Sequence, residues 1–351
     1  MPAATLRVTR TPTSRLTAAL REEAPFGSVF ADHMLVARCA DGRWDDADIR
    51  PYGPMPMSPA IVALHYGQSL FEGFKAYRTP DGAAIFRIRD NWARLNRTAA
   101  RLCMPPVPED IFVAGITALV QLDREWIPTR AGASLYIRPV YFAADEVLSV
   151  KPAASYLFVV MTAPVPPYFA GTVNLLAEER YVRAFPGGTG DVKPSGNYGG
   201  AMLAAHDAQA RGFHHVLWLD GIEHRWIEEG GLMNVVFVVD GTLVTPPLGG
   251  TILPGIVRDS VLTLARGIGI GVEERRIAID ELFALHEAGR VTEAAAVGTA
   301  ASIAPIGRIR WRERDIDLTP RGESLIARVG ASLDAIRTGR APDGHGWMTP
   351  V

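Results

Sequence analysis

The chain has 351 residues, which is too long for one small core and suggests two domains. Hydrophobic residues make up 48% and charged residues 21%, and the formal net charge of -2 lacks the basic excess typical of a nucleic-acid binder. No apolar run is long enough to cross a bilayer, so we expect neither a nucleic acid nor a membrane as partner. The two cysteines, Cys39 and Cys103, cannot form a zinc quartet or a redox pair. They favour a reducing, cytoplasmic compartment, and we expect no metal.

The first 163 residues are predicted to form a small mixed α/β domain, preceded by a loose arm at residues 1–23. Three prolines and a glycine in residues 164–171 predict the interdomain linker. In chain order, the patterns predict a strand at 84–88, a helix that starts at Asp90 as its N-cap, a helix within 108–125, and strands at 133–144 and 154–164.

Residues 172–351 are predicted to form a larger domain, so the fold class is α/β with two domains. Asp240-Gly241 marks the tight turn of a hairpin. The other predicted elements are a strand at 172–179, a helix at 201–210, a strand at 214–221, a helix that starts just after Gly255, and a C-terminal helix at about 320–337.

Only three of the 36 basic residues are lysines: Lys75, Lys151 and Lys193. Arginine stays protonated, so imine chemistry would have only these three candidates. Lys193 lies between glycines in GGTGDVKPSGNYGG, where the backbone can approach a ligand closely, and a desolvated lysine amine is nucleophilic towards carbonyls. The alternative is a solvated lysine in a surface turn. Lys151 fits that alternative, and Lys75 fits a structural role.

Three further signals are weak when each is taken alone. Glu228 and Glu229 precede two glycines and could point into a site, although an exposed pair at a turn is common. The helix start after Gly255 would present free backbone N–H groups to a phosphate, or simply begin a helix. The small residues around Thr299 could form an anion-binding turn or a close-packed one.

Together, these segments resemble the branched-chain amino acid aminotransferases, which are pyridoxal-phosphate (PLP) enzymes of fold type IV. The resemblance runs in order from about Phe26 to Val351. The segments that carry it are HYGQSLFEGFKAYR, SLYIRPVYF, GDVKPSGNYGG, the E-x-G-x-M-N run from Glu229 to Asn234, TILPGIVRDSVL, VGTA and the terminal GWMTPV.

The resemblance implies that PLP lies in the cleft between the two domains. Lys193 would hold it through an imine and move the proton between the substrate Cα and C4′. Glu229 would keep the pyridine nitrogen protonated, and Tyr198 would bind the phenolic oxygen. The phosphate would be held by Arg94, the backbone N–H groups of Ile256 and Val257, and the Thr299 hydroxyl.

The resemblance also implies an apolar substrate pocket that accepts a carboxylate as well. Phe26, Tyr66, Phe71 and Tyr136 would form its apolar surface, some of them reaching from a second subunit of a homodimer. Leu148 and Val150 match a loop that crosses the dimer interface. Arg138 and Tyr136 would accommodate the second carboxylate of 2-oxoglutarate, and the Ala300 N–H would hold the α-carboxylate.

The predicted activity is a ping-pong transfer of the amino group of L-Leu, L-Ile or L-Val to 2-oxoglutarate. The alternatives are another fold type IV enzyme, namely a D-amino acid transaminase or an aminodeoxychorismate lyase, and a PLP-binding protein without activity. Two departures from the family pattern stand out. Leu232 replaces a threonine, and Ala301 and Ala304 replace the cysteines of a redox CxxC found in some members.

Overall fold

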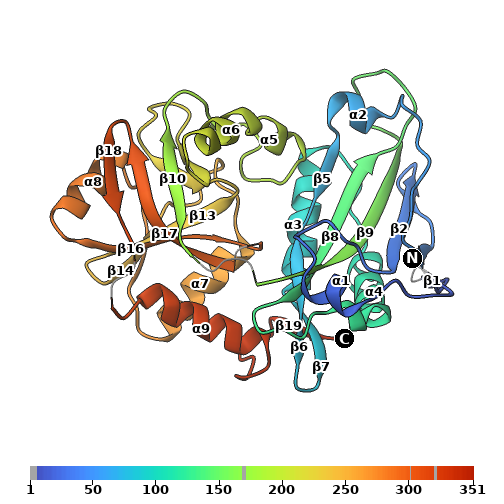
Figure 1. Ribbon diagram of the computed structural model, residues 1–351. Coiled ribbons are helices and arrows are strands. Elements are labelled where there is room, and N and C mark those ends of the chain that lie inside the picture. Colours follow the sequence, from blue (N-terminus) through green and yellow to red (C-terminus); the bar gives the residue numbers. More distant parts are fainter. Residues whose placement is uncertain (1–5, 168–170, 301, 320–321) are drawn as a thin grey trace. The chain divides into compact units, whose positions relative to one another are not determined.

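The computed structural model describes residues 6–167, 171–300, 302–319 and 322–351 (Figure 1). They form two compact units. The first contains the described residues within Met1–Tyr168, Lys193–Gly196 and Ile336–Val351, and the second those within Phe169–Val192 and Asn197–Ala335. The short segment that contains Lys193 therefore belongs to the first unit, although the residues on both sides of it belong to the second.

The first unit is built on a mixed ten-stranded sheet. Its longest strands, β8 and β9, pair antiparallel along their whole length, from Ser134 with Val165 to Ala143 with Tyr156. The spatial order is β1 (Leu6–Val8), β4 (Ala47–Pro51), β2 (His33–Ala40), β9 (Ser155–Val165), β8 (Ser134–Ala143), β6 (Phe74–Thr79), β7 (Gly82–Phe86) and β19 (Met348–Pro350), with β3 (Arg43–Trp44) on β2 and β5 (Ser69–Phe71) on β8.

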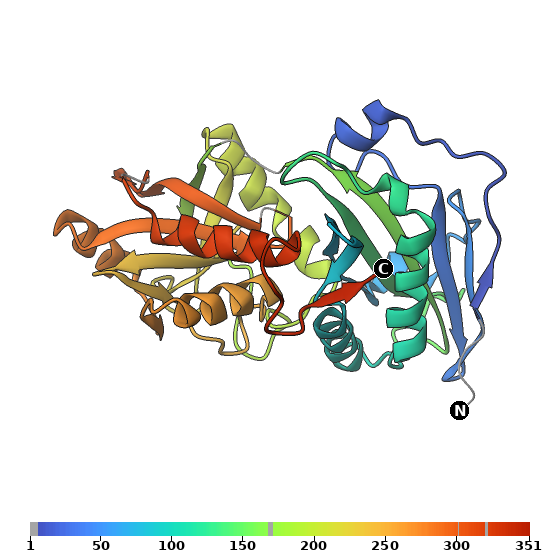
Figure 2. The same ribbon diagram turned by 90° about the horizontal axis from the view of Figure 1, so that it is seen from below.

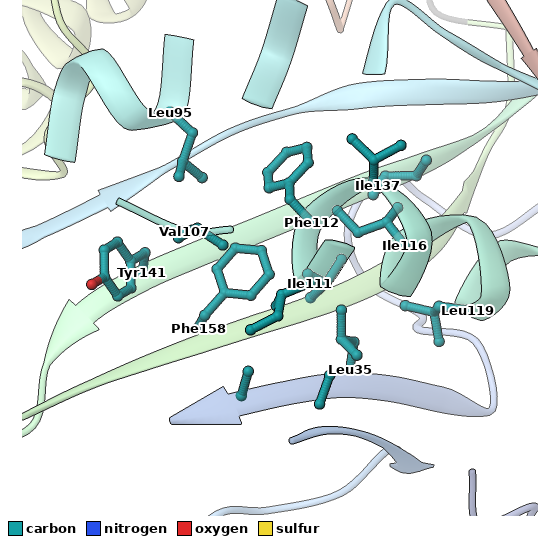
Figure 3. Close-up of a cluster of buried hydrophobic side chains, with 14 of the residues drawn as sticks. Leu35, Leu95, Val107, Ile111, Phe112, Ile116, Leu119, Ile137, Tyr141 and Phe158 are labelled. Carbon is teal, nitrogen blue, oxygen red and sulfur yellow. The ribbon is translucent and has the colours of Figure 1, made fainter. Parts of the chain in front are cut away.

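Helices cover this sheet through one large apolar core (Figure 3). Phe112 stacks near Phe74 and Phe158, with ring centroids 5.9 and 5.8 Å away. Burying each such aromatic side chain contributes about 1.5–3 kcal/mol. The helical elements of this unit are α1 (Ala18–Glu22), α2 (Val62–Tyr66), α3 (Ile88–Arg101), the π-helical turn η1 (Asp110–Ala114), α4 (Gly115–Leu122) and the 3₁₀ turn η2 (Arg124–Trp126).

The N-terminal segment differs from the loose arm predicted for residues 1–23; of these, residues 1–5 lie outside the described residues. Strand β1 pairs in parallel with β4, and Thr17 caps α1 by accepting the Leu20 N–H. Arg15 donates from Nη2 to the carbonyls of Phe30 (3.2 Å) and Ala31 (2.8 Å). These contacts join residues distant in sequence, so local composition gave no sign of them.

The second unit contains a nine-stranded sheet in which β12 pairs with both β11 and β13. The strands β12, β11, β10, β17, β16 and β13 therefore form a closed circuit. Its strands are β12 (Ile227–Gly230), β11 (His215–Leu219), β10 (Val173–Glu178), β17 (Ser302–Trp311), β16 (Val291–Gly298), β13 (Met233–Val239), β14 (Thr242–Thr245) and β15 (Val272–Glu274), with β18 (Arg314–Asp317) on β17.

Helices lie on two sides of this second sheet. Figures 1 and 2 show α7 and α9 side by side on one side and α6 on the other. Leu176 and Trp218 of the sheet pack against Ala204 and Ala208 of α6. The helices of this unit are α5 (Gly196–Gly199), α6 (Met202–Ala210), α7 (Ile256–Gly267), α8 (Ile279–Glu287) and α9 (Leu325–Arg337). No helix within the described ranges is long and apolar enough to cross a membrane.

Most predicted elements are present, and two boundaries are wrong. Helix α3 starts before Asp90, at a left-handed Arg87 (φ 51°), and Asp90 instead accepts from the Arg87 Nε (2.9 Å). Helix α9 starts at Leu325 rather than near 320. The Glu293 carboxylate of β16 accepts the Leu325 N–H (2.8 Å) and fixes the start by a long-range contact. Strand β9 runs on to Val165, and residues 168–170 of the predicted linker lie outside the described residues.

Candidate active site

Lys193 lies beside strand β5 in the first unit. Its backbone N–H donates to Thr98 Oγ1 (3.1 Å), and its carbonyl accepts from the Phe71 N–H (3.4 Å). The next residue, Pro194, forms a β-bridge with Leu70. The Lys193 Nζ lies 4.8 Å from the centroid of the Phe71 ring, and the residue is half-buried. The amine is thus held against an aromatic surface by a backbone fixed on both sides. Lys75 is buried in β6 and Lys151 is exposed.

Arg94, predicted to hold the phosphate, is buried on α3 with 5% of its surface exposed. It forms a bidentate ion pair with Glu72, in which Nε lies 2.7 Å from Oε1 and Nη2 lies 2.7 Å from Oε2. Glu72 is fully buried. This geometry fixes the plane of the guanidinium, because two parallel hydrogen bonds allow little rotation.

A cavity of about 380 Å³ lies in the same unit and is lined by Phe26, Phe71, Tyr136 and Arg138. The Phe26 and Tyr136 rings meet edge to face at 5.2 Å. Arg138 Nη2 donates to the Tyr136 hydroxyl (3.0 Å), and its guanidinium carbon lies 4.6 Å from the Phe71 centroid. An apolar surface and a cation therefore share one cavity. Gly73 is required beside it, because a Cβ there would come 2.0 Å from the Tyr136 hydroxyl. Phe30 also lines the cavity.

Three residues of the first unit that are predicted for substrate contact do not line this cavity, and neither does Ala300 of the second unit. Tyr66 is 43% exposed, Leu148 67% and Val150 83%. They lie at the end of α2 and in the loop between β8 and β9, and Ile61 and Glu146 form a β-bridge between these two regions. The structure thus separates these residues from the cavity and gathers them on exposed surface of the first unit.

Glu229 lies on β12 of the second unit and is 4% exposed. Its Oε1 accepts the Leu253 N–H (2.9 Å) and lies 3.4 Å from the Asn234 amide nitrogen. The Arg183 Nε lies 3.2 Å from its Oε2. A nearby guanidinium favours the negative form of a carboxylate. Tyr198 lines the same small pocket, as do Leu232, the residue that departs from the family pattern, and Val192, which directly precedes Lys193 in the chain.

Glu228, the neighbour of Glu229, has a different environment. It lines a separate cavity of about 300 Å³ with Asp220, Trp226 and Arg276. Burial raises the pKa of Glu228, partly offset by the Thr251 hydroxyl and the charge of Arg183. The two adjacent acids therefore differ in surroundings: Glu229, which the motif spacing predicts as the cofactor-binding acid, lines the small pocket with Tyr198, and Glu228 does not.

The predicted phosphate-binding groups of the second unit lie at two turns. Ile256 and Val257 are the first residues of α7, whose N-cap is Gly255. A Cβ on Gly255 would come 2.0 Å from Asn234 Oδ1, so this close approach requires glycine. Thr299 and Ala300 lie in the turn between β16 and β17, which Gly298 and Ser302 close as a pair. Ala301 lies outside the described residues.

Three residues that organise these clusters were missed by sequence reasoning: Glu72, Thr98 and Arg183. Glu72 lies within the segment HYGQSLFEGFKAYR and Thr98 within the helix predicted from Asp90. Their partners, Arg94 and Lys193, lie 22 and 95 positions further along the chain. Arg183 precedes the glycine-rich stretch by several residues. The only available signal was that a buried acid requires a cationic or hydrogen-bonding partner, which does not say which arginine supplies it.

Comparison with protein families assigns the chain to a class of enzyme that agrees with this fold and with these clusters. The chain matches the family described as Amino-transferase class IV over residues 69–309 and belongs to it. The expected fold type IV architecture is confirmed by solved structures. The Escherichia coli branched-chain amino acid aminotransferase superposes with a TM-score of 0.75 at 26% identity, covering 91% of this chain and 98% of that one.

Individual relatives indicate which group within class IV the chain belongs to. A probable branched-chain-amino-acid aminotransferase of Staphylococcus aureus (strain MRSA252) is 43% identical over 332 residues, covering 93% of both chains. A T.th. branched-chain amino acid aminotransferase, solved in complex with N-(5'-phosphopyridoxyl)-L-glutamate, gives a TM-score of 0.71 at 28% identity, covering 90% of this chain and 97% of that one. Within class IV, the chain thus falls in the branched-chain-amino-acid aminotransferase group. These relatives support the branched-chain interpretation over the two other fold type IV activities.

Proposed function

We propose that the protein transfers the amino group of L-Leu, L-Ile or L-Val to 2-oxoglutarate with PLP as cofactor. The observation that carries this proposal is the cavity of the first unit, where Phe71 contacts the Lys193 amine and also stacks on the Arg138 guanidinium. One aromatic residue therefore links a nucleophilic amine, an apolar surface and a cation. That combination suits a substrate pair of which one member has an alkyl side chain and the other a carboxylate.

The residues present fit PLP. A lysine amine beside an aromatic ring can hold an aldehyde, and the buried Glu229 can accept a hydrogen bond from a protonated pyridine nitrogen. The N-terminus of α7, with Gly255 closely packed as its cap, offers backbone N–H groups to a phosphate. The complex of the T.th. relative with a phosphopyridoxyl compound supports the same cofactor.

Each cofactor-binding residue contacts a different part of the cofactor in this proposal. Lys193 holds the cofactor covalently, Tyr198 binds its phenolic oxygen and Glu229 its ring nitrogen. Bound PLP supplies an electron sink for the negative charge that develops at the substrate Cα. Arg94, the Ile256 and Val257 N–H groups and the Thr299 hydroxyl bind the phosphate.

Lys193 also acts as the acid and base of the reaction. Its amine would become free once the amino group of the substrate has replaced it on the cofactor, and it would then move the proton between the substrate Cα and C4′, with the reverse transfer in the second half-reaction. Because the reaction is ping-pong, the branched-chain 2-oxo acid leaves before 2-oxoglutarate binds. The same cavity therefore receives both side chains. Phe26, Phe71 and Tyr136 bind the alkyl group, Arg138 binds the second carboxylate, and the Ala300 N–H binds the α-carboxylate.

Exposed apolar side chains favour a homodimer. Tyr66, Leu148, Val150 and Leu64 (71% exposed) are large apolar side chains exposed to water on the first unit, in two regions that the Ile61–Glu146 bridge joins. We propose that a second copy covers them and that these residues contribute to the neighbouring site. The mass in solution, measured by light scattering, should be that of a dimer, and Leu148→Asp should reduce it. A monomeric, fully active wild type would contradict this proposal.

Steady-state transamination tests the proposed function directly. The purified protein, supplied with PLP and 2-oxoglutarate, should turn over L-leucine, L-isoleucine and L-valine and leave D-alanine almost untouched. A preference for D-alanine would favour a D-amino acid transaminase instead. A protein that binds PLP but transfers no amino group would favour the binding-protein alternative.

A further inference from the structure

The two adjacent acids of β12 hold one segment of chain at two points. That segment, Thr251 to Gly255, connects the end of a loop to the first turn of α7. Glu229 Oε1 accepts the backbone N–H of Leu253 at 2.9 Å. Glu228 Oε1 accepts the Thr251 hydroxyl at 2.5 Å. The segment is therefore tied to the carboxylate proposed for the pyridine nitrogen and, two residues earlier, to the acid beside it.

Thr251 is fixed by more than its hydroxyl. Its carbonyl accepts from Arg183 Nη2, and Arg183 also faces Glu229. A Cβ on Gly190 would come 2.3 Å from the Thr251 carbonyl oxygen, so the backbone is closely packed there. One residue thus bonds to both partners of a short network, Glu228 through its side chain and Arg183 through its main chain.

Glu228 is buried for a reason that the cofactor roles do not explain. It is 6% exposed, and among the described residues its Oε2 has no hydrogen-bond partner. Burying a carboxyl group with an unpaired oxygen costs free energy, and its remaining contacts must offset that cost. Within the described part of the chain, the hydrogen bond that its side chain makes is to Thr251, so the benefit is expected at the segment that Thr251 begins.

The far end of that segment carries the cofactor-binding groups. The Leu253 carbonyl accepts from the Asn234 amide (3.0 Å), and Gly255 lies against the same side chain. Ile256 and Val257 follow directly as the first residues of α7. A displacement at Thr251 would therefore reach the Leu253 N–H, which orients Glu229, and the N–H groups proposed for the phosphate.

We propose that Glu228 and Thr251 are positioning residues of the cofactor site, whose hydrogen bond sets the place of segment 251–255 and through it the orientation of Glu229 and the start of α7. The inference rests on the proposed function, because it assumes that Glu229 and α7 bind PLP. Neither Glu228 nor Thr251 needs to touch the cofactor.

The test is a double-mutant cycle read out by PLP affinity. Thr251→Val removes the hydroxyl at nearly constant volume, and Glu228→Leu removes its acceptor. Each should raise the dissociation constant for PLP, measured by equilibrium dialysis, about tenfold. This is the effect of losing one buried hydrogen bond. The double variant should lose no more than either single one. Thr251→Ser keeps the hydroxyl and should restore affinity to within about twofold of wild type. The absorbance band of bound PLP should shift in the two single variants and not in Thr251→Ser.

Thr245→Val is the matched control, because it loses a hydroxyl bond of a fully buried threonine, to the Val235 carbonyl (2.7 Å), outside the segment. It should lower stability and leave PLP affinity unchanged. Additive losses in the double variant, or wild-type affinity in both single variants, would overturn the positioning role. Should Thr251→Val not fold, Glu228→Leu alone decides, since a leucine is no larger than the glutamate it replaces and the adjoining cavity leaves it room. Failure of the wild type to bind PLP would overturn the proposed function, and the inference with it.

Discussion

Glu72 and Arg94 form a buried ion pair in which both hydrogen bonds measure 2.7 Å. The acid comes from the turn between β5 and β6, and the base from the middle of α3. A guanidinium held this way presents a fixed edge to a ligand and does not sample the rotamers of an exposed arginine. A buried arginine whose plane is fixed in this way is suited to serve as an oriented anion-binding group.

Removing one partner of this pair should be costly. We expect Glu72→Ala to lower the free energy of unfolding by about 3–5 kcal/mol, because it removes the bidentate carboxylate partner of a buried guanidinium. Urea denaturation followed by circular dichroism measures this loss. Glu179→Ala breaks the half-exposed pair with Arg312 and should cost only about 0–1 kcal/mol. Equal losses in the two variants would show that the buried pair contributes no more to the free energy of unfolding than the exposed pair.

Arg138 should determine how well the dicarboxylate substrate binds. We expect Arg138→Met to raise the KM for 2-oxoglutarate about tenfold or more, since a charge-assisted hydrogen bond contributes about 1.5–3 kcal/mol. The KM for 4-methyl-2-oxopentanoate should change much less, because its side chain has no charge. Arg38→Met, an exposed change on β2, serves as the control. Parallel increases for both oxo acids would argue against this role.

Part of this fold could be read from the sequence because some segments carry their own local signals. Strands β8 and β9 are long apolar runs, and Asp240-Gly241 marks the turn between β13 and β14. The start of α9 could not be read, because the Glu293 carboxylate that caps it comes from another strand. Local propensity says nothing about a partner that distant in sequence.

The candidate site likewise combines residues that have a local sequence signal with residues that depend on distant partners. Lys193 is a candidate on sequence grounds because the chain has only three lysines, and the motif spacing favours Glu229 over Glu228. Glu72, Arg183 and Thr251 act through tertiary contacts with residues far along the chain. Their residue types are ordinary for their local sequence, so only coordinates reveal them.

Asp220 should make stability depend on pH in the acidic range. Burial alone would raise its pKa, but backbone N–H donors of the following turn outweigh burial and lower the pKa to about 2; they belong to Ile222, Glu223, Arg225 and Trp226. Because this value lies below the ordinary 3.8, the ionised form stabilises the fold in full above that pH. The contribution is lost as the pH falls towards 2.

Asp220→Asn should therefore lower the free energy of unfolding at pH 7 by about 2 kcal/mol, the value of a shift of this size. The difference from wild type should shrink between about pH 4 and 2. Glu223→Gln, an exposed acid of the same turn, is the control and should show little effect at any pH. A gap that stayed constant down to about pH 2 would mean that Asp220 does not titrate as its contacts imply.

Arg15 does not line the cavity of the first unit but should help to position the loop that does. Its two hydrogen bonds to the Phe30 and Ala31 carbonyls hold the loop that carries Phe26 and Phe30. We expect Arg15→Ala to raise the KM for L-leucine about 3–10-fold, the range for one or two partly exposed hydrogen bonds. PLP affinity should not change. Arg10→Ala, an exposed change in the same segment, should have no effect on KM, and an equal effect there would rule out a specific role for Arg15.

The identity of the lysine that holds the cofactor is the most direct test of the whole account. The PLP-loaded protein is reduced with borohydride and digested, and the peptide carrying the phosphopyridoxyl group is identified by mass spectrometry. We predict that the label lies on Lys193 alone and that Lys193→Ala abolishes it. A label on Lys75 or Lys151, or no label in a protein that transaminates, would contradict the account.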